Sequence, residues 1–248
     1  MRLLIANVAV FFLQLLFSPT PELLMGLVPA RIPQQPWTLI TYSFLHGGFG
    51  HLFFNMLGLY FFGPRLEERL GGGHFLGLYV VSAVVGGLAS WPVTPHAMIV
   101  GASGAVYGVL LGFARYWPRQ QIMLLIPPIP MEARTLVIVF AVISLVLGLT
   151  GSGGIAHFAH LGGFVGGWLY LKWRESRSPA ARFKAKARPV PKVRELGTDL
   201  KEWAAARREE MHPVNRAELD RILDKIGAAG MASLSADERA FLERFQNG

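Results

Sequence analysis

The chain has 248 residues, of which 52% are hydrophobic and only 16% charged, with a formal net charge of +8 and no cysteine. This composition is too apolar for a wholly soluble protein, and the lack of cysteine excludes disulfides and thiolate metal sites. Only nine of the 24 basic residues and four of the 16 acidic residues lie in the first 174 positions. We therefore predict that the part ending near Arg174 is embedded in a membrane.

Six apolar stretches approach the length of about 20 residues that a membrane-spanning helix needs. They cover roughly 3–18, 50–69, 74–92, 101–117, 135–152 and 157–173. Glycine- or proline-rich breaks separate them, and Trp91, Trp117 and Trp173 fall at segment ends, where indole rings favour the lipid–water boundary. The first stretch would also suit a cleaved signal peptide, but no small-x-small cleavage site follows it. The sequence therefore predicts an all-α membrane protein with six transmembrane helices.

The basic residues predict the orientation of these spans. Except for Arg31, all of them in the first 174 positions fall on one side of the six-span arrangement. Since basic loops stay in the cytoplasm, both termini are expected there, and spans two, four and six run inward from the outer face. His51 and Asn55, Ser103, and His160 then lie near the outer starts of these spans. Polar groups inside a membrane are costly and usually mark function, so we expect a site at this depth.

A glycine pattern suggests that Ser103 and His160 meet. Span four has glycine at every fourth residue (Gly104, Gly108 and Gly112) and span six does the same (Gly163 and Gly167). Such stripes let helices approach closely enough for a serine hydroxyl to lie about 3 Å from an imidazole, as a nucleophile and its base require. The alternative is that the serine and the histidine are ordinary packing residues of apolar helices.

No carboxylate is placed to complete a Ser-His-Asp triad. The first aspartate is Asp199, Glu67 and Glu68 belong to the opposite membrane face, and Glu22 and Glu132 lie in loops. The sequence therefore predicts a Ser-His dyad.

Two further groups are candidates for supporting roles. His51 and Asn55 are four residues apart, so both side chains point from one helix face, where they and the Ser103 backbone N–H are expected to stabilise an oxyanion. Hydrogen bonding between helices is the alternative for Asn55. Tyr107, one turn after Ser103, is expected to pack against the imidazole, unless it is an ordinary packed aromatic.

These motifs, in this order, resemble the rhomboid intramembrane serine proteases over roughly residues 1–174. The resemblance rests on His46, on His51-x-x-x-Asn55, on Gly101-x-Ser103-Gly104 and on His160-x-x-Gly163-x-x-x-Gly167, with Gly63-x-x-x-Glu67-x-x-x-Gly71 in addition. It implies that Ser103 is the nucleophile, His160 the general base, His51 and Asn55 the oxyanion stabilisers, and Tyr107 the residue stacked on the catalytic histidine. One departure is Thr38 after Trp37, where family members often have arginine.

The resemblance implies a six-span rhomboid bundle that hydrolyses peptide bonds in or near transmembrane helices of membrane proteins, in a bacterial inner membrane, with its site open toward the outer face. We expect no cofactor, no metal and no nucleic-acid partner. One alternative is a non-proteolytic rhomboid-like protein that binds membrane helices. Another is a small transporter, which is disfavoured because the polar residues cluster at one depth.

The last third of the chain has a different character. Residues 175–198 form a basic linker rich in proline and alanine, and 199–248 are predicted to be a small cytoplasmic helical domain. Its signals are an apolar stripe at Leu219, Ile222, Leu223 and Ile226, ended by Gly227 and Gly230, and a capping box at Ser235–Glu238 before an apolar face of Phe241, Leu242 and Phe245. We expect it to serve in docking, partner binding or dimerisation.

Overall fold

The computed structural model describes residues 1–125, 128–151, 157–178 and 211–246. Most of the predicted basic linker, together with Asp199, lies outside the described residues. The chain divides into two compact units, Met1–Arg182 and Phe183–Gly248, which are treated separately below.

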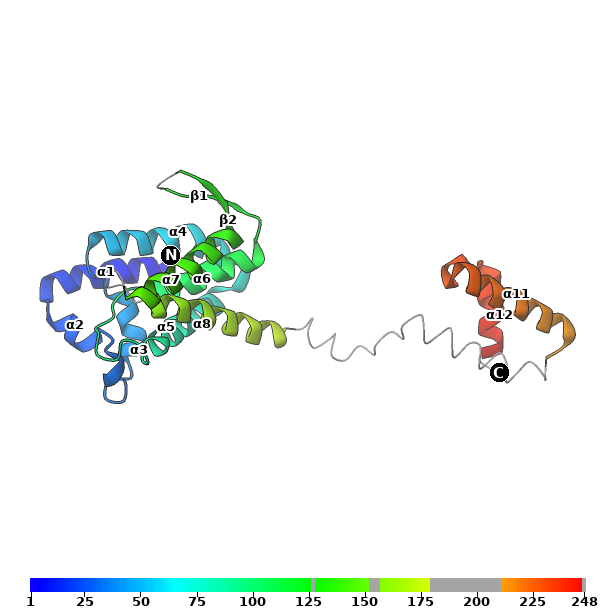
Figure 1. Ribbon diagram of the computed structural model, residues 1–248, viewed down its shortest axis with the longest axis horizontal. Helices are drawn as coiled ribbons and strands as arrows, with labels where there is room; N and C mark the ends of the chain where they lie inside the picture. Colours follow the sequence, from blue (N-terminus) through cyan, green and yellow to red (C-terminus); the bar gives the residue numbers. More distant parts are fainter. Residues whose placement is uncertain (126–127, 152–156, 179–210, 247–248) are drawn as a thin grey trace. The chain divides into compact units, whose positions relative to one another are not determined.

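The described part of the first unit contains six helices of 14 to 22 residues, one for each apolar stretch predicted (Figure 1). They are α1 (Arg2–Phe17), α4 (Phe49–Leu70), α5 (Gly72–Ala89), α6 (Ser103–Tyr116), α7 (Ala133–Thr150) and α8 (His157–Ser176). Of the helices described, α5 and α7 have both the length and the hydropathy of membrane-spanning segments, and α1 is apolar but shorter.

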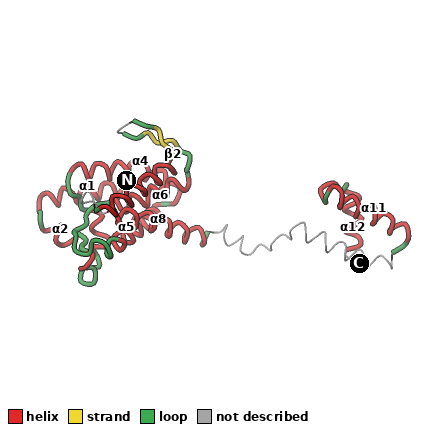
Figure 2. The backbone as a smooth tube through the Cα atoms, in the orientation of Figure 1, coloured by secondary structure: helices red, strands yellow, loops and turns green. Residues whose placement is uncertain are grey.

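Shorter elements connect these helices (Figure 2). The loop after α1 contains α2 (Thr20–Met25), the 3-10 turns Pro29–Arg31 and Tyr42–Phe44, and α3 (Thr38–Thr41). Between α6 and α7 the chain forms an antiparallel hairpin of β1 (Gln121–Met123) and β2 (Pro130–Glu132), with Gln121 opposite Glu132. The proline-rich sequence indicated a turn here but not the two strands around it.

Helix α8 packs closely against both α5 and α6 because glycine occupies two of its faces. Gly163 and Gly167 lie against the α6 backbone at Gly104 and Gly108, as the stripes predicted. Gly162 and Gly166 lie against the α5 backbone, where an added Cβ would come within 2.7 Å of the Val85 oxygen and 2.8 Å of the Val81 oxygen, respectively. The second stripe was not predicted, and it makes α8 the element that brings α5 and α6 together.

Polar contacts attach α1 to the segment that precedes α4. Gln14 donates from Nε2 to the His46 carbonyl at 2.9 Å and accepts the His46 backbone N–H at 3.0 Å. Nearer the start of α1, Asn7 donates to the Tyr79 hydroxyl at 3.4 Å, which in turn donates to the Ser43 carbonyl at 3.1 Å. A polar residue in an apolar span is a signal for such a role, and Gln14 could have been found from it.

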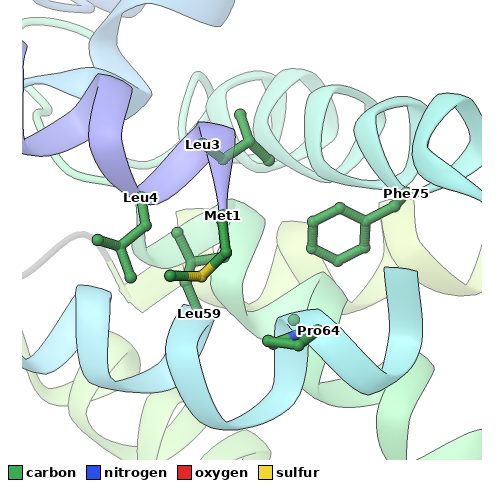
Figure 3. Close-up of a pocket in the computed structure, with 7 residues that line it drawn as sticks. Met1, Leu3, Leu4, Leu59, Pro64 and Phe75 are labelled. Atoms are coloured by element: carbon green, nitrogen blue, oxygen red, sulfur yellow. The ribbon is translucent and has the colours of Figure 1, made fainter. Parts of the chain in front are cut away.

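A small apolar pocket lies where the start of α1 meets α4 and α5 (Figure 3). Its volume is about 10 Å³, which is close to the space that one water molecule needs. It is lined by Met1, Leu3, Leu4, Leu59, Gly63, Pro64 and Phe75. The pocket therefore reflects helix packing and is too small to bind a ligand.

The second unit contains α11 (Pro213–Ala229), a 3-10 turn (Met231–Ser233) and α12 (Ala236–Gln246). Its buried core is formed by Met211, Leu219, Ile222, Leu234 and Leu242. The predicted capping box is present: the Glu238 N–H donates to Ser235 Oγ at 3.2 Å, and the Ser235 N–H donates to Glu238 Oε2 at 2.7 Å.

The end of α11 differs from the sequence prediction, and one predicted apolar side chain of α12 is not described. Helix α11 runs through Gly227 and stops at Gly230, whose φ of +76° is a conformation that glycine adopts readily. The side chain of Phe245 lies outside the described residues.

Candidate active site

Ser103 is the first residue of α6, and a turn that requires glycine precedes it. Gly101 has a φ of +127°, which side chains other than glycine rarely adopt, and its N–H donates to the Tyr42 carbonyl at 3.0 Å. An added Cβ on Gly101 would lie 2.6 Å from Nε2 of His51. Just before this turn, Ile99 forms two backbone hydrogen bonds with Leu27, at 2.7 and 3.0 Å. The loop after α1 thus supports the segment that carries the serine.

His160 comes from α8, 57 positions later in the chain, and its Nε2 lies 2.7 Å from Ser103 Oγ. His160 is 8% exposed. Helices α6 and α8 come this close because Gly163, one turn after His160, lies directly against the Gly104 carbonyl, where any side chain would overlap. The structure therefore brings the two predicted residues to hydrogen-bond distance.

Tyr107 stacks on the His160 imidazole, with ring centroids 4.4 Å apart and an interplanar angle of 22°. Phe164 packs against the same tyrosine, with centroids 4.8 Å apart. The tyrosine hydroxyl hydrogen-bonds Ser144 of α7, which is 1% exposed. Aromatic and hydrogen-bond contacts thus fix Tyr107, and its face restrains the imidazole.

His51 lies beside the serine turn with a defined pattern of hydrogen bonds. Its Nδ1 accepts the Gly47 N–H at 3.2 Å, so the neutral ring carries its proton on Nε2, the atom that faces Gly101. Asn55 is 5% exposed and donates from Nδ2 to the His51 carbonyl at 2.9 Å, which leaves its second amide hydrogen available. Both residues therefore keep an N–H that is not used within the helix.

Among the described residues, no group hydrogen-bonds Nδ1 of His160, so no carboxylate orients this ring. The nearest unexpected neighbour is His157, whose ring centroid lies 6.0 Å away in an edge-to-face arrangement. His157 is 6% exposed, and neither of its nitrogens has a partner in the described part of the chain. Three residues after His157 comes His160 and not a glycine, so His157 does not match the histidine motif, and its proximity to the site was not predicted.

His46 and Thr38 are both buried, and His46 lies next to His51. The His46 ring is edge-on to His51, with centroids 5.2 Å apart, and its backbone is held by Gln14. Thr38 is 1% exposed and donates from its hydroxyl to the Gln35 carbonyl at 2.6 Å. The residue that departs from the common family pattern is therefore a satisfied buried threonine, and a long cationic side chain would not fit in its place unchanged.

A serine hydroxyl paired with a neutral imidazole, with N–H donors on the adjacent turn, is the arrangement that acyl transfer to serine requires. The N–H groups of the first residues of α6 have no intrahelical acceptor, which adds donors next to Oγ. Within the described ranges, no cluster of three or more His, Asp or Glu side chains is suited to hold a metal ion.

Comparison with protein families gives two matches. Residues 33–174 match the Rhomboid domain, which is more than half of the chain, and residues 209–247 match a family of unknown function, DUF6576.

Similar proteins occur in bacteria, plants and fungi. The putative rhomboid protease YdcA of Bacillus subtilis is 34% identical over 134 residues, covering 54% of this chain and 64% of the relative. RHOMBOID-like protein 4 of Arabidopsis thaliana is 35% identical over 135 residues, covering 54% and 33%. The mitochondrial Rhomboid protein 1 of Saccharomyces cerevisiae is 36% identical over 139 residues, covering 54% and 40%. The matched region is thus less than two thirds of each of these relatives.

Proposed function

Because this chain belongs to the rhomboid family of helical integral membrane proteins, we propose that it is an intramembrane serine endopeptidase with Ser103 as nucleophile and His160 as general base. The observation that carries the proposal is the 2.7 Å separation of Ser103 Oγ and His160 Nε2 under the stacked ring of Tyr107. The names of the bacterial relatives YdcA and GluP, both called rhomboid proteases, support it.

The proposed reaction follows from these atoms. The Ser103 hydroxyl donates its proton to Nε2 of His160 as Oγ attacks the scissile carbonyl carbon, and the imidazolium then protonates the leaving amine as the C–N bond breaks. A water molecule then gives a proton to the same nitrogen as its oxygen attacks the acyl carbon. The imidazolium returns this proton to Ser103 Oγ as the bond between Oγ and the acyl carbon breaks, which releases the carboxylic acid and restores the serine. Nδ1 of His160 has no hydrogen-bond partner among the described residues, which supports a dyad in which the Tyr107 ring, in place of a carboxylate, restrains the histidine.

We assign the oxyanion to donors on two elements. His51 directs Nε2–H toward the Gly101 turn, and the first N–H groups of α6 belong to Ser103 and the residues that follow it. Asn55 supplies its second amide hydrogen and holds the His51 carbonyl with the first. Four glycines support this arrangement. Gly101 lets the turn lie against the His51 ring, and α6 and α8 pack closely at Gly104, Gly163 and Gly167.

The substrates proposed are membrane proteins with transmembrane helices. A peptide bond in a lipid-embedded helix is shielded by its own hydrogen bonds, so the substrate has to unwind locally before Oγ reaches it. The six long helices are proposed as six spans with both termini in the cytoplasm of a bacterium, and the basic residues of the loops support a site open toward the outer face.

The proposed domain organisation is a protease domain at 1–174, a basic linker at 175–198 and a small cytoplasmic domain at 199–248. The match of residues 209–247 to a separate family supports the last boundary. The family's function is unknown, so docking, partner binding and dimerisation remain the proposed uses.

The decisive experiment is cleavage of a model membrane-spanning substrate by the purified chain in lipid vesicles, with Ser103→Ala as the matched control. We expect cleavage by the wild type alone, and labelling of Ser103 by a fluorophosphonate that His160→Ala abolishes. Cleavage that persists in Ser103→Ala would refute the proposal. A wild type that binds transmembrane helices without cleaving them would favour a non-proteolytic rhomboid-like protein.

A further inference from the structure

A second cavity, of about 400 Å³, lies between α6, α7 and α8. Its lining includes Arg115 near the end of α6 and Arg134 near the start of α7. Arg115 is 12 residues from Ser103, or about 18 Å along the helix. The cavity is therefore remote from the serine and histidine, and the proposed reaction does not use it.

The walls of the cavity are apolar and open to the surroundings. Its apolar lining residues are Leu111, Ala114, Val137, Ile138 and Trp168. Ile138 is 60% exposed and Trp168 is 44% exposed. Only 17% of the α7 residues are buried, compared with 39% of those of α5, so α7 is the more exposed helix, and the cavity lies beside it. In a membrane this opening faces lipid chains.

The polar end of the cavity carries more positive than negative charge. Arg115 pairs through Nε and Nη2 with Glu175, and Arg134 donates from Nε to Glu132 at 2.6 Å. Each guanidinium has five N–H groups, so these pairs leave donors on both arginines. Lys172 adds a third cation, with Nζ 4.7 Å from the Trp168 ring centroid.

We propose that this cavity binds one anionic phospholipid, with the phosphate at Arg115 and Arg134 and an acyl chain along Leu111, Val137 and Ile138. Basic pockets between transmembrane helices are suited to acidic headgroups. The apolar lining distinguishes the site from a surface that only attracts anions, because a soluble phosphate would leave these walls without a partner. The bound chain would fill the cavity beside α7.

The test is native mass spectrometry of the full chain in detergent, titrated with phosphatidylglycerol or phosphatidylcholine. We expect one phosphatidylglycerol to be retained in preference to phosphatidylcholine. Arg134→Gln should weaken retention roughly fivefold through loss of one charge. Val137→Trp should weaken it through loss of acyl-chain space while every charge remains. Arg119→Gln is the matched control, since it removes an exposed charge from the nearby connection between α6 and α7, and Arg119 does not line the cavity.

Equal retention of both lipids would overturn the proposal, as would equal effects of Arg134→Gln and Arg119→Gln, which would indicate general charge attraction. If glycerol phosphate displaced the lipid at matched concentration, the site would be one for a free anion. Thermal unfolding of each variant distinguishes lost binding from lost folding, and Val137→Trp tests the site without disturbing either ion pair. None of these measurements depends on proteolysis.

Discussion

Gly163 of α8 lies against the backbone carbonyl of Gly104 in α6, with no room for a single additional carbon atom between them. This contact sets the separation of the helices one turn away from the Ser103–His160 pair. The obstacle is backbone on a buried helix, which cannot move aside as a flexible side chain would. The distance between Ser103 and His160 therefore depends on glycine, which has no side chain, at position 163.

We predict that Gly163→Ala abolishes cleavage and lowers stability by about 1–3 kcal/mol, the usual cost of overpacking. Gly73→Ala in α5 is the matched control, because its Cβ would meet nothing within 4 Å and alanine favours a helix. Thermal unfolding and substrate cleavage should both separate the two variants. Normal activity in Gly163→Ala would mean that the helices can move apart without separating the dyad.

Replacement of Tyr107 should distinguish stacking from hydrogen bonding. Tyr107→Ala removes the ring that covers the imidazole, and we expect kcat to fall by roughly 2- to 12-fold, the range that aromatic pairs typically contribute. Tyr107→Phe keeps the ring and loses only the bond to Ser144, so its kcat should stay close to wild type. Equal losses in both variants would assign the role to the hydroxyl.

Removal of the proposed oxyanion donors should affect the chemical step. For His51→Ala we expect kcat to fall about 10²- to 10³-fold with little change in KM, as for other oxyanion donors. Asn55→Ala should also lower kcat, because it removes both the second amide hydrogen and the bond to the His51 carbonyl. Single-turnover kinetics in detergent would measure both. An unchanged kcat in His51→Ala would remove this residue from the mechanism.

Gln14 should matter for stability although it is far from Ser103 in the sequence. Gln14→Leu leaves the N–H and the C=O of His46 without partners in a buried position, which we expect to cost about 1–3 kcal/mol. Gln34→Leu, at an exposed position of the loop, is the control. Thermal unfolding in detergent compares them, and a melting temperature of Gln14→Leu equal to that of the control would contradict the prediction.

We predict that the second unit loses stability at acid pH because Glu238 becomes protonated. Hydrogen bonds from Lys225, from the Ser235 N–H and from Arg221 lower the pKa of this carboxyl from 4.5 to about 2. The unfolded chain therefore binds the proton first as pH falls, and the contribution to stability is complete above 4.5 and lost progressively toward 2. Hydrogen exchange of α12, corrected for intrinsic rates, should show this loss. Glu238→Gln should be less protected at neutral pH and lack this dependence.

Much of the first unit follows from apolar segment length alone, because lipid requires helices and long apolar runs have few alternatives. The i,i+4 glycine stripes indicated which helices approach each other, and the order of motifs indicated the family. The sequence did not reveal the second stripe, Gly162 and Gly166, since a glycine-rich helix does not indicate which face meets which neighbour. His157 was missed for a related reason: its proximity to His160 depends on how the first turn of α8 is placed.

The pairing of Leu27 with Ile99, and of Gly101 with Tyr42, has a practical consequence for engineering. The loop after α1 and the extended segment before Ser103 are joined by backbone hydrogen bonds, so they support the serine together although they are far apart in the sequence. A chimaera that takes residues 26–46 from a relative should therefore take 97–101 as well. Exchange of either part alone would combine segments from different proteins at the Leu27–Ile99 and Tyr42–Gly101 contacts, and we expect Ser103 to be displaced even when only residues 26–46 are exchanged.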